Sequence, residues 1–149
     1  MYYSIFDLFK IGIGPSSSHT TGPMVAAENF AGRLNRSNTL HNVLAIKITL
    51  YGSLAFTGAA HGVEKGIILG LEGYAPSTLN SSLIAKTVNK VYKNNKVNIL
   101  QNKKIEFCPN ECIAFDTSTP PTGHSNTMKI GAYDKDGKEI LRKTYYSIG

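Results

Sequence analysis

Cysteine is scarce in this sequence: the chain has only Cys108 and Cys112. Two thiols do not make the disulfide framework that stabilises small secreted domains, so we expect a reducing, cytoplasmic setting. No second pair of Cys or His residues accompanies them at metal-binding spacing. We therefore expect no zinc or iron–sulfur centre held by this chain alone.

Long apolar runs are absent as well. No stretch approaches the roughly 20 apolar residues of a membrane-spanning helix. The opening MYYSIFDLFK lacks the basic start and long apolar run of a secretory signal peptide. A P-loop, a glycine-rich dinucleotide fingerprint and a Gly-x-Ser-x-Gly nucleophile elbow are also missing. These absences argue against a membrane protein and against three familiar kinds of enzyme site.

Acidic residues are few: the chain has 10 Asp and Glu residues against 16 Lys and Arg residues, which gives a formal net charge of +6. Several lysines surround one expected helix and the turn after it, where their spacing predicts a solvated face. Arginines do not interleave with aromatic residues as a stacking platform for nucleic acid requires, so no nucleic-acid binding is expected. We interpret the charge as solvation plus a surface that faces a more acidic partner. The lysines are Lys86, Lys90, Lys93, Lys96, Lys103 and Lys104.

What the sequence does contain is the composition of a folded domain. Its 149 residues are 42% apolar and 17% charged, which suits a single domain over residues 1–149 with a genuine core. Apolar residues at helical spacing predict a first helix around Phe30, with Pro23 in its first turn. A second helix is expected from about Ala59 to Leu71, and an amphipathic third helix around Val88.

Alternating apolar residues predict the strands. The stretch from Val43 to Tyr51 places Leu44 and the alternate residues after it on one buried face, and Gly52 to Gly58 follows as a loop. Further strands are expected around Ile113 and Met128, before a hairpin at DKDGK. The order helix, strand, helices, strands predicts an α+β fold. In this fold the helices pack on one face of a mixed, mainly antiparallel sheet of about four strands.

The second expected helix carries glycines four residues apart, at Gly62, Gly66 and Gly70. Each glycine costs a helix interior roughly 1 kcal/mol relative to alanine. Such a smooth face is tolerable if another backbone, or another domain, packs closely against it. Glu64 and Lys65 in the middle of the stretch exclude a membrane-dimer interpretation.

Polar side chains crowd the stretch GIGPSSSHTTGP just before the first helix. Their hydroxyls and an imidazole, together with the unpaired N–H groups at the helix start, could hold a small carboxylate. Ordinary helix capping beside an idle, exposed histidine is an equally weighted alternative. The side chains concerned are Ser16, Ser17, Ser18 and His19.

Two further histidines lie in unusual surroundings. His61 sits among small residues in GAAHG and is accessible to a ligand or another domain, although a capping or packing role is more common. His124 lies in PPTGHSN, between a stiff proline pair and Asn126, and a solvent-facing turn is the alternative there. His41 is assigned no function. The residues alone therefore predict a domain with histidine-bearing loops suited to a small zwitterion.

Four stretches carry a family resemblance: SIFDLFKIGIGPSSSHTTGPMVAA, GSLAFTGAAHG, PPTGHSNTM and the closing YYSIG. In this order they resemble the N-terminal beta domain of bacterial iron–sulfur-dependent L-serine dehydratases, also called L-serine ammonia-lyases. The resemblance spans Ser4 to Gly149. It implies a cytoplasmic lyase of amino-acid metabolism and gluconeogenesis that converts L-serine to pyruvate and ammonia without pyridoxal phosphate.

The resemblance also implies a cofactor and a partner. In the family a [4Fe–4S] cluster leaves one iron without a cysteine, and this iron acts as Lewis acid on the substrate hydroxyl. The cluster cysteines belong to an alpha domain that is absent from this chain, and Cys108 and Cys112 do not match their motif. We therefore expect an excised domain that holds no cluster and is inactive alone. We also expect the parent enzyme to be a homodimer.

The family's beta domain is similar to the allosteric substrate-binding domain of some D-3-phosphoglycerate dehydrogenases. This second likeness implies that His124 and Asn126 bind L-serine or a related small acid as effector. His19, His61 and Ser147 would then face the catalytic domain, with His61 as the candidate proton acceptor. The glycine-lined helix face would permit the close approach of that domain. A purely regulatory module is the alternative.

Overall fold

The computed structural model describes residues 17–57, 62–118 and 126–147 of the chain. Its helices are α2 (Ser17–Arg36), α3 (Ser53–Thr57), α4 (Val63–Leu71), α5 (Ser81–Asn94) and α6 (Pro109–Cys112), with 3-10 helices η1 (Leu40–Asn42) and η2 (Pro76–Thr78). Its strands are β1 (Ala45–Gly52), β2 (Lys96–Ile99), β3 (Lys103–Glu106), β4 (Ile113–Asp116), β5 (Asn126–Tyr133) and β6 (Glu139–Ser147).

Four strands form one sheet in the order β4-β1-β5-β6. Strand β1 runs parallel to β4 and antiparallel to β5, and β5 is antiparallel to β6. On β1, Ile46 and Ile48 are buried whereas Lys47 between them is exposed, as the alternation predicts. Leu44 was expected on the buried face, but it is 52% exposed and lies just outside the strand, which begins at Ala45.

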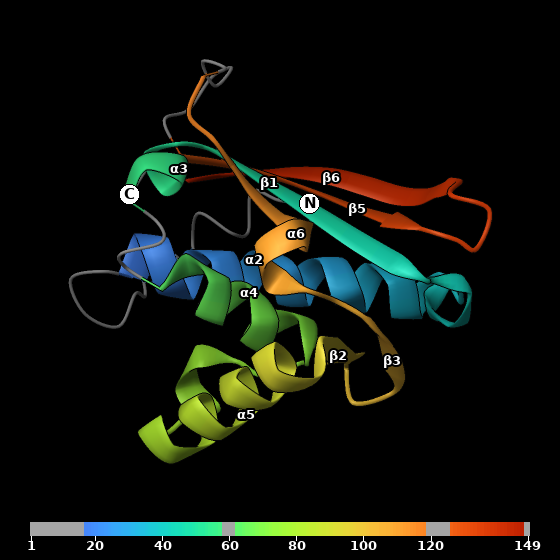
Figure 1. Cartoon of the computed structure of the whole chain (residues 1–149), viewed down its shortest axis with the longest axis horizontal. Coiled ribbons are helices and arrows are strands. Elements are labelled where there is room, and N and C mark those ends of the chain that lie inside the picture. The colour runs from blue at the N-terminus through green and yellow to red at the C-terminus, as the bar shows by residue number, and fades with distance from the viewer. Residues whose placement is uncertain (1–16, 58–61, 119–125, 148–149) are drawn as a thin grey trace.

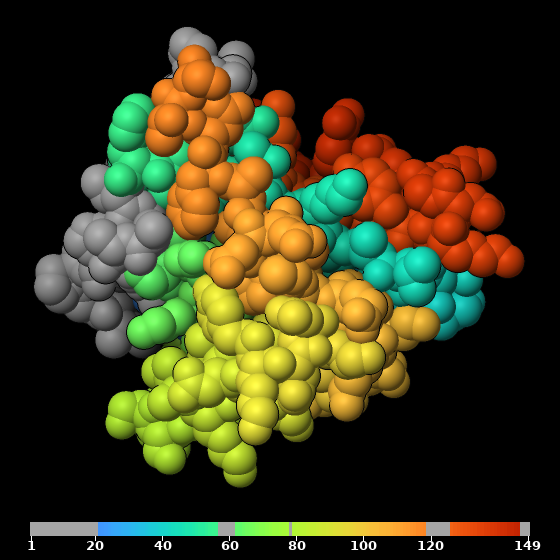
Figure 2. Space-filling model, viewed as in Figure 1, coloured from blue at the N-terminus to red at the C-terminus, as the bar shows by residue number. Residues whose placement is uncertain are grey.

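Helices α2 and α4 lie under one face of this sheet, and α5 with the β2–β3 hairpin lies on the side of α4 away from the sheet (Figure 1). Phe30 and Leu34 of α2 and Ile67 of α4 are fully buried between these layers. The surface seen in Figure 2 is formed largely by α5, the hairpin, β4 and β6. No helix in the described ranges is long and apolar enough to cross a membrane. The predicted fold class, with helices on one face of a mixed and mainly antiparallel sheet, is confirmed.

Helix α4 crosses α2 at very close range, and Gly70 makes this crossing possible. A Cβ atom on Gly70 would lie only 2.1 Å from the carbonyl oxygen of Met24 and 3.0 Å from the backbone nitrogen of Glu28. The close neighbour of this glycine is therefore another backbone, that of α2, which is one of the two alternatives that the glycine spacing left open. Gly62 precedes the helix, with a φ of 77°.

The first helix begins earlier than predicted. It starts at Ser17, so Pro23 lies inside α2 rather than in its first turn. Because proline has no N–H, Pro23 cannot donate a hydrogen bond to the carbonyl group four residues earlier. The serine run therefore continues into the first turn of the helix instead of ending before it.

The segment between β1 and α4 also differs from the prediction. Gly52 to Gly58 was expected to be a loop, yet it contains α3. Gly52 has a φ of 64° and turns the chain at the end of β1, and Leu54 is then buried against the core. The helix expected from about Ala59 begins at Val63.

The β2–β3 hairpin was not predicted. Lys96, Lys103 and Lys104 were assigned to the surroundings of the third helix, but they lie on the two strands of this hairpin. Each strand has only four residues, which is too short for its alternation to stand out from the neighbouring sequence. At the turn, Leu100 and Gln101 adopt positive φ values of 51° and 58° where a hairpin signature would place Asn or Gly.

Candidate functional site

One end of the main sheet brings three of the four resemblance motifs together. Because β5 is antiparallel to both of its neighbours, Asn126 at its start pairs with Gly52 at the end of β1 and with Ser147 at the end of β6. Helix α3 follows Gly52 directly and lies at this same end (Figure 1). The motif segments GSLAFT, NTM and YYS thus lie close together in space, although 95 positions separate Gly52 from Ser147 in the sequence.

Asn126 is the polar centre of this end. Its side chain is buried, with 2% of the residue exposed, and its Oδ1 accepts a hydrogen bond from the Oγ of Ser53 at the start of α3. A buried carboxamide has to be hydrogen-bonded, since leaving one unpaired costs about 1–3 kcal/mol. With Oδ1 accepting, the amide nitrogen is the donor end of the group.

A narrow crevice, with room for about 10 Å³, lies beside Asn126. Its walls come from the early turns of α2, from α3, and from the paired ends of β5 and β6. The residues are Gly22, Pro23, Ala26, Leu54, Asn126, Met128, Tyr145 and Tyr146. This brings α2, which carries the fourth motif, to the same end of the sheet. This space is close to the minimum that a single water molecule occupies.

Tyr145 ties β6 to α2 next to the crevice. Its hydroxyl donates a 2.8 Å hydrogen bond to Oδ1 of Asn29, and only 3% of the residue is exposed. Burial raises the pKa of Tyr145 above the usual 10.0, and the nearby Arg33 and Arg36 offset this in part. Tyr145 therefore stays neutral at physiological pH and holds the strand end in place.

The structure describes some of the predicted site residues in full, others by their backbone alone, and others not at all. Asn126 is described in full, and the backbone of Ser147 lies opposite it on β6. The backbones of Ser17, Ser18 and His19 form the start of α2, but their side chains lie outside the described residues, as does the side chain of Ser147. Ser16, His61 and His124 lie wholly outside the described ranges.

Neither Ser53 nor Tyr145 was predicted as a site residue. Ser53 lies in GSLAFTGAAHG, and a serine directly after a strand-ending glycine is a typical start for a helix, which was a usable signal. Tyr145 precedes the closing YSIG, and its partner Asn29 lies 116 positions away. No local pattern indicates such a pair.

The two cysteines lie elsewhere, at the two ends of α6. Both are free and half-buried, and burial is the main cause that raises the pKa of the Cys112 thiol. No group of three or more His, Cys, Asp or Glu residues within the described part of the chain is arranged to hold a metal ion. A [4Fe–4S] cluster uses more thiolates than the two this chain has, so these residues do not fit that cofactor.

Comparison with known proteins decides the family. The family model described as "Serine dehydratase beta chain" matches residues 4–149. The chain belongs to the serine dehydratase beta chain family. It is similar to proteins named L-serine dehydratase from Streptomyces coelicolor, with 42% identity over the whole chain, and from Haemophilus influenzae, with 40% identity over 98% of it. L-serine dehydratase 1 of Escherichia coli is 38% identical over 98% of the chain.

These relatives are much longer proteins. This chain covers 33% of the Streptomyces coelicolor protein and 32% of each of the other two. The chain thus spans about a third of the length of the curated relatives it matches. The family resemblance inferred from the four motifs is confirmed by this match.

Proposed function

We propose that this chain is the beta domain of an iron–sulfur L-serine dehydratase. It supports the conversion of L-serine to pyruvate and ammonia by a cluster-bearing alpha domain, in the reducing cytoplasm and in a homodimeric enzyme. Membership of the serine dehydratase beta chain family supports this proposal. The structural observation that carries it is the buried Asn126 at the sheet end where the family's motif segments meet.

The chemistry of that end suits a small amino acid. Ser53 donates to Oδ1 of Asn126 and so orients its side chain, and in this proposal the amide of Asn126 contributes one N–H donor toward a carboxylate. His124, two positions earlier in the sequence, adds a second donor in this proposal. Ser16, Ser17 and Ser18 supply hydroxyl groups at the start of α2, where helix N–H groups also favour an anion.

The catalytic part of the proposal involves the alpha domain. Since the two cysteines of this chain do not fit a [4Fe–4S] cluster, the cluster belongs to that domain, where an open iron supplies Lewis-acid activation of the substrate hydroxyl. His61, which lies between α3 and α4 in the sequence, is the candidate proton acceptor. His19 and Ser147 face the alpha domain beside it.

A second candidate function is a purely regulatory module that binds L-serine or a related small acid. The position of Asn126 favours it, because strands β1, β5 and β6 of the beta domain supply the backbone around this residue. In that case a ligand at Asn126 changes the activity of the partner domain without taking part in the reaction. The two functions differ in whether the histidines of this chain affect turnover.

Single substitutions in the intact enzyme separate these functions. We expect His61→Ala to lower kcat, and Asn126→Ala and His124→Ala to change mainly the dependence of the rate on L-serine concentration. His41→Ala is the matched control, because His41 is exposed and lies in η1, away from the motifs. An unchanged kcat in His61→Ala with altered serine dependence in the other two favours the regulatory module. If none of the three variants differs from the control, both site assignments are wrong.

A further inference from the structure

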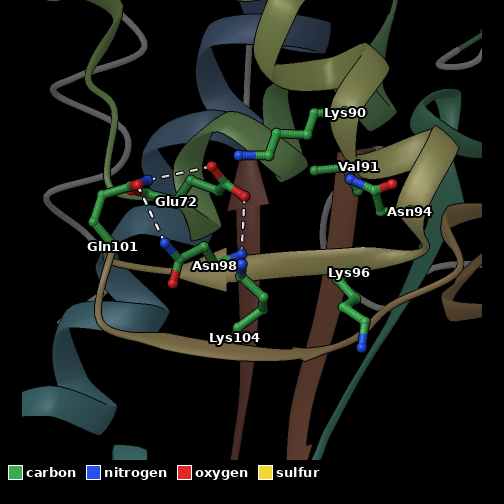
Figure 3. A pocket seen from close by; sticks show the side chains of 8 residues that line it. All are labelled: Glu72, Lys90, Val91, Asn94, Lys96, Asn98, Gln101 and Lys104. Atoms are coloured by element: carbon green, nitrogen blue, oxygen red, sulfur yellow. Dashed lines mark hydrogen bonds between the residues drawn. The ribbon is translucent and has the colours of Figure 1, made fainter.

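A second cavity, of about 280 Å³, lies between the C-terminal end of α4, the second half of α5 and the β2–β3 hairpin (Figure 3). None of the residues that line it belongs to the Asn126 site. They are Glu72, Lys90, Val91, Asn94, Lys96, Asn98, Gln101 and Lys104. The cavity is therefore a feature of the outer helix layer, and the proposed serine site does not account for it.

A network of hydrogen bonds shapes one wall of this cavity. The carboxylate of Glu72 accepts from the backbone nitrogen of Asn98 at 2.8 Å and from Nε2 of Gln101 at 3.2 Å. The same Nε2 donates to the backbone oxygen of Glu72 at 2.9 Å, and Nδ2 of Asn98 donates to Oε1 of Gln101 at 3.3 Å. The hairpin turn is thus fixed to the end of α4, and Glu72 is already committed to protein donors.

Positive charge dominates the rest of the cavity. Lys90 from α5 and Lys104 from β3 extend into it from different elements (Figure 3). Neither forms an ion pair with any of the described residues, whereas Lys96 is paired with Glu106 at 2.8 Å. Glu72 is the one carboxylate among the lining residues of the cavity. Two ammonium groups therefore converge on a concave space in which the only acid is held by other donors.

We propose that this cavity binds a small anion with at least two negative charges, such as a phosphate monoester or a polycarboxylate. Lys90 and Lys104 provide the charge, and the amides of Asn94 and Asn98 provide further donors. The concave shape favours a small molecule over an acidic protein segment, because small-molecule sites are clefts of a few hundred Å³. The volume limits the ligand to roughly the size of a phosphorylated or polycarboxylic metabolite.

The test is an NMR titration of the 15N-labelled chain with inorganic phosphate and, separately, with citrate, at constant ionic strength. We expect saturable shifts confined to the amides around Asn98, Gln101 and Lys104. Lys90→Gln and Lys104→Gln should each weaken binding about tenfold, the usual loss of a charge-assisted contact. Lys93→Gln is the matched control, since it removes the same charge from the same helix outside the cavity lining. All three lysines are exposed, and the same spectra verify that each variant is folded.

Each outcome bears on the proposal. Binding of phosphate alone assigns the ligand to phosphate esters, and binding of citrate alone assigns it to polycarboxylates. Absence of a saturable shift with either anion overturns the proposal. An equal loss of affinity in Lys93→Gln overturns it too, because binding would then follow overall charge. If a glutamate-rich peptide shifts amides along Lys86 and Lys93 while both small anions have no effect, the face docks an acidic protein instead.

Discussion

At the scale of single residues, Tyr145 shows how strongly the fold alters side-chain chemistry. Its ring closes the crevice beside Asn126, and its hydroxyl reaches Asn29 on α2. Burial disfavours the charged phenolate, so the pKa of Tyr145 lies above the usual 10.0. The side chain therefore links the sheet to α2 only in its neutral form.

We predict that Tyr145→Phe lowers the free energy of unfolding by about 1 kcal/mol at neutral pH, the usual value of one hydrogen bond. The pKa of Tyr145 is higher in the folded than in the unfolded chain. The stability that this tyrosine provides is therefore complete below pH 10 and is lost as the pH rises further. The difference in free energy of unfolding between the parent chain and Tyr145→Phe should become smaller above this pH. Urea unfolding of both chains from neutral pH to about pH 11 measures this difference, and a difference that stays constant with pH would contradict the prediction.

The residues of the site differ in how far their sequence neighbours indicate them. Asn126 was predicted as a binding residue because His124 and a proline pair precede it. Its partner Ser53 lies 73 positions away, and only the pairing of β1 with β5 brings the two together. Hydrogen bonds of this kind depend on long-range register, which no local pattern contains.

At the scale of elements, the close crossing of α2 and α4 depends on a glycine, Gly70. The Gly70 position has no room for a side chain, because Met24 and Glu28 present backbone atoms rather than movable side-chain ends. By contrast, a Cβ on Gly32 of the same α2 would meet the guanidinium of Arg36 at 3.0 Å, and this flexible side chain can move away. The two glycines thus offer a matched comparison.

We predict that Gly70→Ala destabilises the chain by about 2–3 kcal/mol, since the helices must separate to accept the methyl group. Gly32→Ala should stabilise it by up to about 1 kcal/mol through higher helix propensity. Urea unfolding of both variants at neutral pH measures the difference. Equal effects of the same sign would show that Gly70 does not set the distance between the helices.

The ends of helices and strands could be predicted only where residues close in sequence, such as a capping side chain or a regular apolar stripe, determine them. The third helix was predicted correctly because its apolar stripe is regular, and Asn80 caps it by accepting from the backbone nitrogen of Leu83. The start of α2 was not predicted, because Ser and Thr are accepted both before a helix and in its first turn. The β2–β3 hairpin escaped prediction because packing against α4, rather than its own apolar pattern, holds it.

At the scale of the whole molecule, α2 and α4 lie between two layers of different size. The main sheet lies on one side, and α5 with the hairpin lies on the other (Figure 1). The order of elements was enough to predict the fold class, because strands and helices that follow one another tend to pack in layers. The order of elements could not indicate that the outer layer, which consists of α5 and the β2–β3 hairpin, packs chiefly against α4. That contact follows from side-chain packing between helices.

This arrangement predicts two levels of stability. The outer layer is the smaller one, so we expect α5 and the hairpin to open while the sheet stays folded. Two buried isoleucines test this: Ile48 lies in β1 and Ile99 in β2. Replacing either by valine costs about 1 kcal/mol. Ile48→Val should accelerate hydrogen exchange about fivefold in β1 and β5 and leave α5 unchanged, because the sheet remains intact when the outer layer opens.

Ile99→Val should act differently, because Ile99 loses its contacts both when the outer layer opens and when the whole chain unfolds. Exchange should therefore accelerate in α5, β2 and β3 and also in the sheet. The asymmetry between the two variants is the decisive measurement. If Ile48→Val accelerates exchange in α5 as much as in β1, the layers unfold together. The hairpin and its cavity are then no less stable than the sheet that positions Asn126.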